Sequence, residues 1–174
     1  MKQFTSKLLS HNWTIILLLA IATIVAYSNS FDAPFQFDDE VQLLLNQRNQ
    51  NISTFTKLST WINVNYRPLS TFTLALNYRW GGENVFGYHL FNLMIHLLAG
   101  VILFFLLKRL NNFRQNNNSL LLPVVATLFF LLHPAQTQSV TYIVQRMTSL
   151  SGMFTLLSVY AYLVGRHEWL IAKN

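Results

Sequence analysis

Three consecutive acids behind an aromatic residue are the part of this sequence best suited to chemistry. They form the stretch FDDE at residues 37–40, shortly after a long apolar run ends. Carboxylates at such a place can hold a divalent cation through oxygen ligands, or keep Asp38 or Asp39 available as a base for an acceptor hydroxyl. The alternative is a solvated helix start, in which Glu40 and its neighbours complement the positive end of a helix over residues 41–45.

Two arginines can supply positive charge to the same compartment. Arg146 borders the last long apolar run, and Arg67 lies in a tight turn just before Pro68. A planar guanidinium pairs with phosphate through parallel hydrogen bonds, so Arg146 could bind a lipid-borne phosphate. The alternatives are that Arg146 extends to the membrane interface and that Arg67 caps its turn or contacts headgroups.

Histidine and asparagine side chains form a polar stripe in the second apolar run. His89, Asn92 and His96 recur at i, i+3 and i+7, which places them on one helix face that should pack against protein. The two histidines are separated by about 10 Å along the axis, so interhelical hydrogen bonds are favoured over a shared metal ion. His133 precedes Pro134 at a helix end, where a structural role is favoured over a role in a site.

The composition predicts a membrane protein. Of 174 residues, 52% are hydrophobic and 10% are charged, far fewer charges than in a soluble domain. The absence of cysteine excludes disulfides, thiolate metal sites and cysteine nucleophiles. The lysines and arginines lie between apolar runs rather than in one patch, so nucleic acid is not an expected partner. Phosphate-binding glycine loops, Ser-His-Asp patterns and zinc-ligand spacings are also missing.

The elements that must position these residues are transmembrane helices, predicted at residues 12–30, 85–107, 119–133 and 147–164. The first run reaches about 28 Å as a helix, and the alternative is a cleaved signal peptide. The third run reaches only about 20 Å, so it must draw in flanking residues, thin the bilayer or re-enter. The predicted fold is a single all-α integral membrane domain over residues 1–174.

The distribution of charge predicts the topology. Basic residues occur at alternate ends of the predicted spans, and five of the six acids fall in residues 31–84. The positive-inside rule therefore places both termini in the cytoplasm and residues 31–84 in an extracytoplasmic loop, in a multi-pass protein of the plasma (inner) membrane. Within the loop we expect juxtamembrane amphipathic helices, one near residues 58–62 and one from Pro68 to Gly81.

The fourth predicted span carries a face of small residues. Hydroxyl residues recur there at spacings of three and four, from Thr148 to Tyr162, with Gly152 beside them. Such faces let helices approach closely, so this one can pack on the other spans or on helices of a second polypeptide. Transport is disfavoured, because no charged residue lies inside a predicted span.

Four stretches taken together resemble a known family. They are FDD at 37–39, YRPLS at 66–70, YHLFNL at 88–93 with His96, and HPAQTQSVTYIVQR at 133–146. In this order and spacing they resemble the N-terminal part of polytopic GT-C glycosyltransferases. The nearest relatives are expected to be bacterial O-mannosyltransferase-like membrane proteins that carry tetratricopeptide repeats.

The resemblance implies protein glycosylation at the extracytoplasmic face, with a sugar moved from a polyprenyl-phosphate donor to a hydroxyl acceptor. It assigns Asp38 or Asp39 as catalytic base or metal contact, and Arg146, with Arg67 as a second cation, to the donor phosphate. Glu40, His89 and His133 are candidate supporting residues. The expected partners are membrane lipid and the lipid-linked sugar, and a divalent cation is the candidate cofactor.

The sequence departs from the family in its number of helices. GT-C enzymes contain a larger helix set than the predicted spans, so the chain is expected to be an incomplete GT-C module. A second polypeptide could supply the missing helices, or activity could be absent. The alternative function is a non-catalytic membrane subunit or scaffold that docks through its fourth span.

Overall fold

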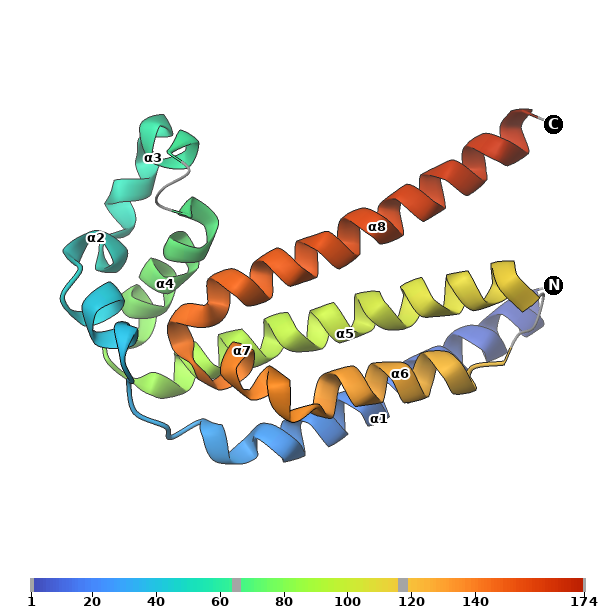
Figure 1. Cartoon of the computed structure of the whole chain (residues 1–174), viewed down its shortest axis with the longest axis horizontal. Coiled ribbons are helices and arrows are strands. Elements are labelled where there is room, and N and C mark those ends of the chain that lie inside the picture. Colours follow the sequence, from blue (N-terminus) through green and yellow to red (C-terminus); the bar gives the residue numbers. More distant parts are fainter. Residues whose placement is uncertain (1, 64–66, 116–118, 174) are drawn as a thin grey trace. The chain divides into compact units, whose positions relative to one another are not determined.

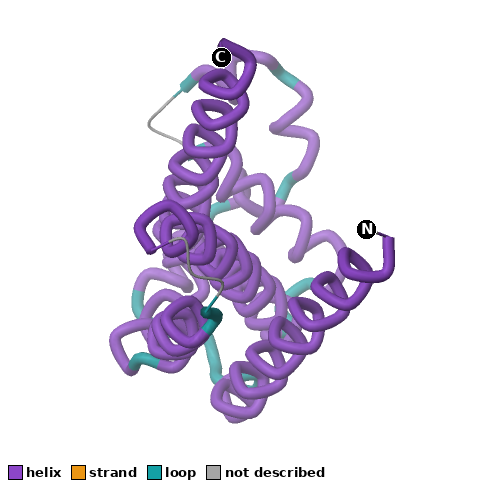
Figure 2. Tube along the Cα trace, turned by 90° about the vertical axis from the view of Figure 1, so that its right-hand side faces the viewer, coloured by secondary structure: helices purple, strands orange, loops and turns teal. Residues whose placement is uncertain are grey.

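The chain is α-helical throughout its described part. The computed structural model describes residues 2–63, 67–115 and 119–173, so Tyr66 of the YRPLS stretch lies outside the described residues. Over these ranges helices are joined by short loops and no strand occurs (Figure 2). The predicted all-α membrane fold is confirmed.

The helices vary from single turns to long rods (Figure 1). In chain order they are α1 (Lys2–Tyr27), η1 (Ser28–Ser30), η2 (Glu40–Leu44), α2 (Gln47–Gln50), η3 (Ile52–Thr56), α3 (Leu58–Ile62), α4 (Pro68–Gly81), α5 (Val85–Gln115), α6 (Leu121–Leu132), η5 (Pro134–Gln136), α7 (Thr137–Thr141), η6 (Ile143–Gln145) and α8 (Arg146–Lys173).

Three helical stretches in the described ranges are long and apolar enough to cross a membrane: Asn12–Ser30, Val85–Phe113 and Ile143–Trp169. A fourth crossing is available if α6 and the following Pro134–Thr141 segment, bent by 50°, act as one broken span. The bend follows from Pro134, which disfavours helical geometry at the preceding residue; His133 is accordingly extended, with ψ 131°. The short third span expected from the sequence corresponds to α6, which with the bent Pro134–Thr141 segment forms a broken span or a re-entrant loop.

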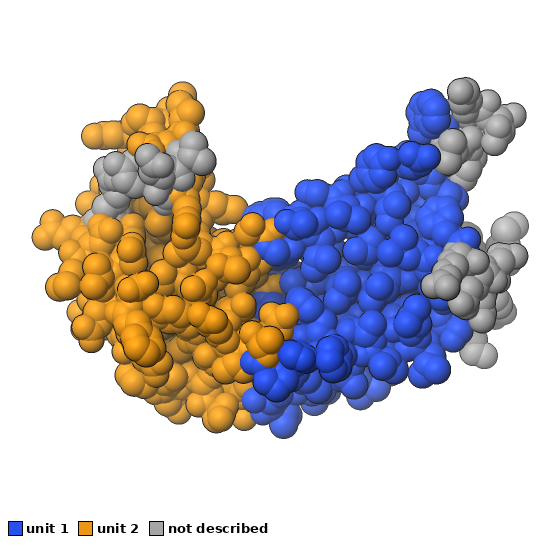
Figure 3. Space-filling model, viewed as in Figure 1, with its two compact units in different colours: residues 1–26, 96–134, 152–174 blue, residues 27–95, 135–151 orange. Residues whose placement is uncertain are grey.

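The chain forms two compact units, coloured separately in Figure 3. One unit comprises residues 1–26, 96–134 and 152–174, and the other comprises residues 27–95 and 135–151. We call the second the loop unit, because it contains the whole of the predicted extracytoplasmic loop. Among the candidate site residues, only His133 lies outside the loop unit.

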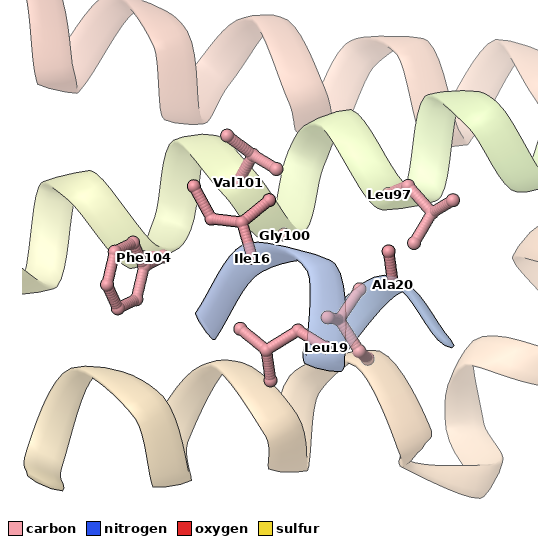
Figure 4. Close-up of a pocket in the computed structure, with 8 residues that line it drawn as sticks. Ile16, Leu19, Ala20, Leu97, Gly100, Val101 and Phe104 are labelled. Carbon is pink, nitrogen blue, oxygen red and sulfur yellow. The ribbon is translucent and has the colours of Figure 1, made fainter. Parts of the chain in front are cut away.

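In the first unit, α1, α5 and α6 pack around Gly100. A β-carbon at Gly100 would lie 2.6 Å from Cδ2 of the buried Leu131 on α6, so a side chain here would require Leu131 or its helix to shift. Beside this contact is an apolar cavity of about 30 Å³. Figure 4 shows side chains of α1, including Ile16 and Leu19, facing those of α5, including Phe104, across it. Close helix approach through a small residue is typical of membrane proteins.

The loop unit contains the two amphipathic helices expected from the sequence. Helix α4 begins at Pro68 and ends at Gly81, followed by Gly82 with φ 58°, as predicted from proline at the first position and glycine at the end. Aromatic rings of Phe55, Trp61 and Phe72 lie with centroids 5.4 to 5.9 Å apart. These ring contacts join α3 to α4, so this part of the loop is packed into a folded structure.

Candidate functional site

Arg146 is the centre of a buried polar network in the loop unit. Its side chain is 0% exposed. Nε donates to Oδ1 of Asn92 at 2.7 Å, and Nη2 donates to the Tyr88 carbonyl at 3.0 Å. The third nitrogen, Nη1, lies 3.4 Å from Oγ1 of Thr73, and the guanidinium carbon lies 4.6 Å from the centre of the Phe91 ring. The structure thus buries the Arg146 side chain, for which the sequence left extension to the membrane interface as an alternative.

All of these Arg146 partners are neutral. Within the described ranges the single ion pair is His167 with Glu168, in the other unit. A buried charge is expensive unless it is paired or fully hydrogen-bonded. Here three oxygen acceptors and an aromatic face satisfy the guanidinium, but no anion from the described residues balances its charge. Among the described residues Arg146 therefore has no ion-pair partner, and a phosphate could take this place.

Asp39 links the acidic stretch to the segment that leads into Arg146. Its side chain is 1% exposed. One carboxylate oxygen accepts the Gln36 N–H at 3.1 Å, and the other accepts the Val144 N–H at 2.9 Å. Burial raises the pKa of the Asp39 carboxyl above its ordinary value, and the hydrogen bonds from Gln36 and Val144 oppose this rise. Two stretches more than 100 residues apart in sequence are thereby brought together.

Asp38 has the opposite environment, with an exposed side chain. Its backbone N–H donates to the Tyr142 hydroxyl at 3.0 Å. The preceding residue, Phe37, has φ 49°, a left-handed backbone that is uncommon outside glycine. Its ring packs edge-on against the Tyr142 ring, with the two ring centroids 6.3 Å apart. Glu40 is also exposed, at the start of η2. Of the two aspartates, Asp38 therefore has the accessible carboxylate.

The polar stripe of α5 faces protein, as its spacing predicted. His89, Asn92 and His96 are all buried. His89 Nε2 pairs with the Ala33 carbonyl at 2.9 Å, and Asn92 Nδ2 donates to the carbonyls of Tyr142 and Ile143 at 3.2 and 3.4 Å. Asn92 therefore binds both Arg146 and the backbone just before it. His89 joins α5 to the first loop rather than to an open site.

Arg67 and His133 have different relations to the network. Arg67 is exposed, has a left-handed backbone with φ 45°, and its guanidinium contacts Sδ of Met147, the neighbour of Arg146. His133 belongs to the other unit, where its ring packs against Phe129 with centroids 4.8 Å apart. The loop unit thus brings Arg67, but not His133, to the segment around Arg146.

Metal binding by Asp38 and Asp39 stays a prediction. No group of three or more His, Cys, Asp or Glu side chains that could hold a metal ion occurs in the described ranges. Both Asp39 oxygens already accept backbone N–H groups, so this carboxylate is satisfied without a cation.

Sequence reasoning missed Tyr142, Thr73 and an open groove of about 500 Å³ between the end of α4 and the start of α5. The groove is lined by Asn77, Trp80, Gly81, Asn84, Phe86, Gly87, Leu90, Phe91 and Met94. None of these residues is charged, and Phe91 also stacks on Arg146. The aromatic residues around Gly81 were the available signal, but only the fold shows that they share one surface.

The chain is similar to curated proteins over most of its length. It is 32% identical over 162 residues to the protein O-mannosyl-transferase TMTC3 of Homo sapiens, which covers 85% of this chain and 16% of that protein. It is 30% identical over 158 residues to tmtc2 of Xenopus laevis, covering 84% and 18%, and 27% identical over 165 residues to TMTC4 of Mus musculus, covering 84% and 22%.

The similarity covers only part of each relative. The chain spans less than a quarter of the length of each of these relatives. No family model matches the chain, and no solved structure matches it. The relatives are animal proteins, so the expected bacterial relatives stay a prediction. The chain is therefore similar to part of the protein O-mannosyl-transferases of animals.

Proposed function

We propose that this chain is the part of a membrane glycosyltransferase that activates the acceptor and binds the donor phosphate. The reaction moves a sugar, by similarity mannose, from a polyprenyl-phosphate donor to a protein hydroxyl at the extracytoplasmic face. The hydrogen bond between Asp39 Oδ1 and Val144 N carries this proposal. It joins the acidic stretch to the segment that ends in Arg146, which supports one site containing both base and cation.

The proposed chemistry uses one carboxylate and one guanidinium. Asp38 or Asp39 accepts the proton of a Ser or Thr hydroxyl while the hydroxyl oxygen bonds to the anomeric carbon of the sugar. The bond from that carbon to the phosphate oxygen breaks, and the phosphate leaves with the electron pair. Arg146 stabilises the negative charge that develops on the phosphate, and the exposed Arg67 contacts the same group from outside.

The uncompensated charge of Arg146 supports its proposed role. The guanidinium is held by neutral oxygens, and a donor phosphate would supply the counter-ion that these contacts lack. The Thr73 contact is the longest of its three, at 3.4 Å, and is the one that a phosphate oxygen would replace at least cost. A local opening near Thr73 is then required for donor binding.

In this proposal the protein lies in the plasma membrane with both termini cytoplasmic, and further helices lie beside α8. Only 6% of the most apolar part of this span is buried within the described residues. In this proposal the remaining surface of α8 faces lipid or additional transmembrane helices, which a second polypeptide could supply. Activity is therefore best measured in native membranes.

The test is sugar transfer from a polyprenyl-phosphate mannose to a Ser/Thr peptide in such membranes. Asp38→Asn and Asp39→Asn should each reduce transfer, because one removes the base and the other removes its support. Asp32→Asn is the matched control, since Asp32 is an exposed acid of the same loop. If both Asp38→Asn and Asp39→Asn transferred sugar at the wild-type rate, the assignment would be wrong.

The second candidate is a non-catalytic subunit that docks through α8. A β-carbon at Gly152 would meet no atom within 4 Å, so the small-residue face is open at this point. Such a face is suited to a second helix. Co-purification of one stoichiometric membrane partner, together with complete absence of sugar transfer, would favour this candidate over the enzyme.

A further inference from the structure

We infer that Asp39 and Tyr142 are positioning residues that hold the backbone of residues 37–39 so that Asp38 alone presents its carboxylate as the base. This inference rests on the proposed function and divides the roles of two adjacent acids. We call the contacts that these residues make the acid clamp: Asp39 to the N–H groups of Gln36 and Val144, and the Tyr142 hydroxyl to the N–H of Asp38.

Asp39 is unsuited to be the base because of where its oxygens lie. A general base must approach the hydroxyl proton to within hydrogen-bond reach, about 2.6–3.2 Å between heavy atoms. The Asp39 side chain is 1% exposed, and each oxygen already accepts one backbone N–H. A protein acceptor cannot reach it without first breaking the clamp. Asp38, one residue earlier, has an exposed side chain.

The clamp also accounts for the backbone at Phe37. A left-handed φ of 49° at a phenylalanine costs free energy and persists only where the surroundings enforce it. Asp39 accepts from Gln36, which closes the chain around Phe37, and the Tyr142 ring packs against the Phe37 ring. The resulting turn directs Asp39 inward and leaves Asp38 outside.

The other side of the clamp is fixed to α5. Asn92 Nδ2 donates to the carbonyls of Tyr142 and Ile143, and Asn92 Oδ1 accepts from Arg146. Residues 142–146 therefore contact the acidic stretch through Tyr142 and Val144 and hold the guanidinium at their end. Loss of Asp39 should loosen residues 36–40 while leaving the contact between Asn92 and Arg146 in place.

Hydrogen exchange measured by mass spectrometry on the full chain in lipid nanodiscs tests the clamp without any need for activity. In Asp39→Asn, peptides covering residues 36–40 and 142–146 should exchange about 10- to 100-fold faster, the effect of losing the buried hydrogen bond from Val144 N–H. Tyr142→Phe loses the exposed hydrogen bond from Asp38 N–H, so the same peptides should exchange faster by a smaller factor. Peptides of α5 should be unchanged, and Asp32→Asn should match the wild type. Unchanged exchange at 36–40 in both clamp variants would overturn the inference.

Tyr142→Phe separates loss of the clamp from a general folding defect. If Asp39→Asn accelerates exchange along all of α5, the variant is unfolded and does not test the clamp. Tyr142→Phe then tests the clamp, because it removes a single hydroxyl from a half-buried ring. Faster exchange confined to residues 36–40 and 142–146 in Tyr142→Phe supports the clamp. Wild-type exchange there overturns it.

Transfer kinetics separate the clamp from the proposed function. Asp38→Asn should abolish transfer, while Asp39→Asn and Tyr142→Phe should each lower kcat about 10- to 100-fold with little change in KM. The double variant should be no slower than the slower single variant, because both act through Asp38. If both Asp38→Asn and Asp39→Asn stay fully active, the proposed function fails even where exchange supports the clamp. If Asp39→Asn abolishes transfer with unchanged exchange, Asp39 is the base and the clamp inference fails.

Discussion

At the scale of single residues, Arg146 is the side chain whose identity the structure constrains most. Its planar guanidinium gives one nitrogen to each of Asn92, Tyr88 and Thr73 while its face lies on Phe91. A lysine ammonium is a compact point charge without a fork or a stacking face, so it cannot reproduce this set.

We therefore predict that Arg146→Lys destabilises the folded chain by about 2 kcal/mol, the loss of two hydrogen bonds and one stacking contact in a buried site. Thermal unfolding in detergent measures this loss. Arg79→Lys is the matched control, because Arg79 is exposed on α4 and should tolerate the change. Equal unfolding temperatures for the two variants would contradict the buried network.

Asp39 leads to a prediction about pH. Burial raises the pKa of its carboxyl, so the folded chain binds this proton more tightly than the unfolded chain does. The associated stabilisation is complete below the unfolded pKa, about 4, and is lost as the pH rises through the higher folded pKa. Asp39→Asn stays neutral at every pH and should lack this loss. The unfolding temperature, measured at a series of pH values from 4 upward, should therefore fall more for the wild type than for Asp39→Asn.

The control for the pH prediction is Asp32→Asn, whose carboxyl is exposed in the wild type. This variant should keep the pH dependence of the wild type. Parallel curves for wild type and Asp39→Asn would show that burial of Asp39 has no thermodynamic consequence.

At the scale of elements, α5 contributes residues to both compact units. Its first turns carry Tyr88, His89 and Asn92, which bind the site segment, and its later turns carry Gly100 and Phe104, which pack in the other unit. A single helix of 31 residues can do this because its polar side chains are confined to one stripe at its start.

We predict that Gly100→Leu disrupts the packing of α5 on α6. The approach to Leu131 is already 2.6 Å for a bare β-carbon, and the adjacent cavity of about 30 Å³ is far too small for an isobutyl group. The expected cost is about 1–3 kcal/mol, as for overpacked cores, measured by unfolding in detergent. Gly165→Leu is the control, because no atom lies within 4 Å of a β-carbon there. Equal stabilities would contradict the close contact.

At the scale of the whole molecule, the contact between Asp39 and Val144 limits the number of membrane crossings. The two residues must lie on the same side of the membrane, so the chain crosses an even number of times between them. The candidate span of α5, Val85–Phe113, supplies one crossing. The bent pair of α6 and the Pro134–Thr141 segment must then be the second, which predicts four crossings and termini on one side.

Reporter fusions test this topology. A reporter after Arg114 and another after Lys173 should both report cytoplasm, because two crossings separate them. A single cysteine at the exposed Asp32 should react with an impermeant thiol reagent from outside, and the absence of native cysteine makes the labelling specific. Opposite locations for the two reporters would exclude the bent crossing and with it the shared site.

Much of the framework follows from local patterns. Pro68 and the glycines after Trp80 determine the ends of α4, and spacing alone identifies the buried stripe of α5. The ends of long helices were less predictable: the apolar run of α5 stops near residue 107, but the helix continues to Gln115. Hydrophobicity reports the part of a helix suited to lipid, whereas the helix itself ends only where its hydrogen bonding does.

The sequence by itself determined the all-α membrane fold, the acidic stretch and the buried face of α5, because composition, caps and helical periodicity are properties of neighbouring residues. Only the tertiary structure decided that Asp39 is buried while Asp38 is exposed, that Tyr142 supports them, and that Arg146 is enclosed by neutral groups. Two adjacent aspartates are equivalent in any local pattern. They differ because the fold brings Val144, more than 100 residues away, to hydrogen-bond with the Asp39 carboxylate.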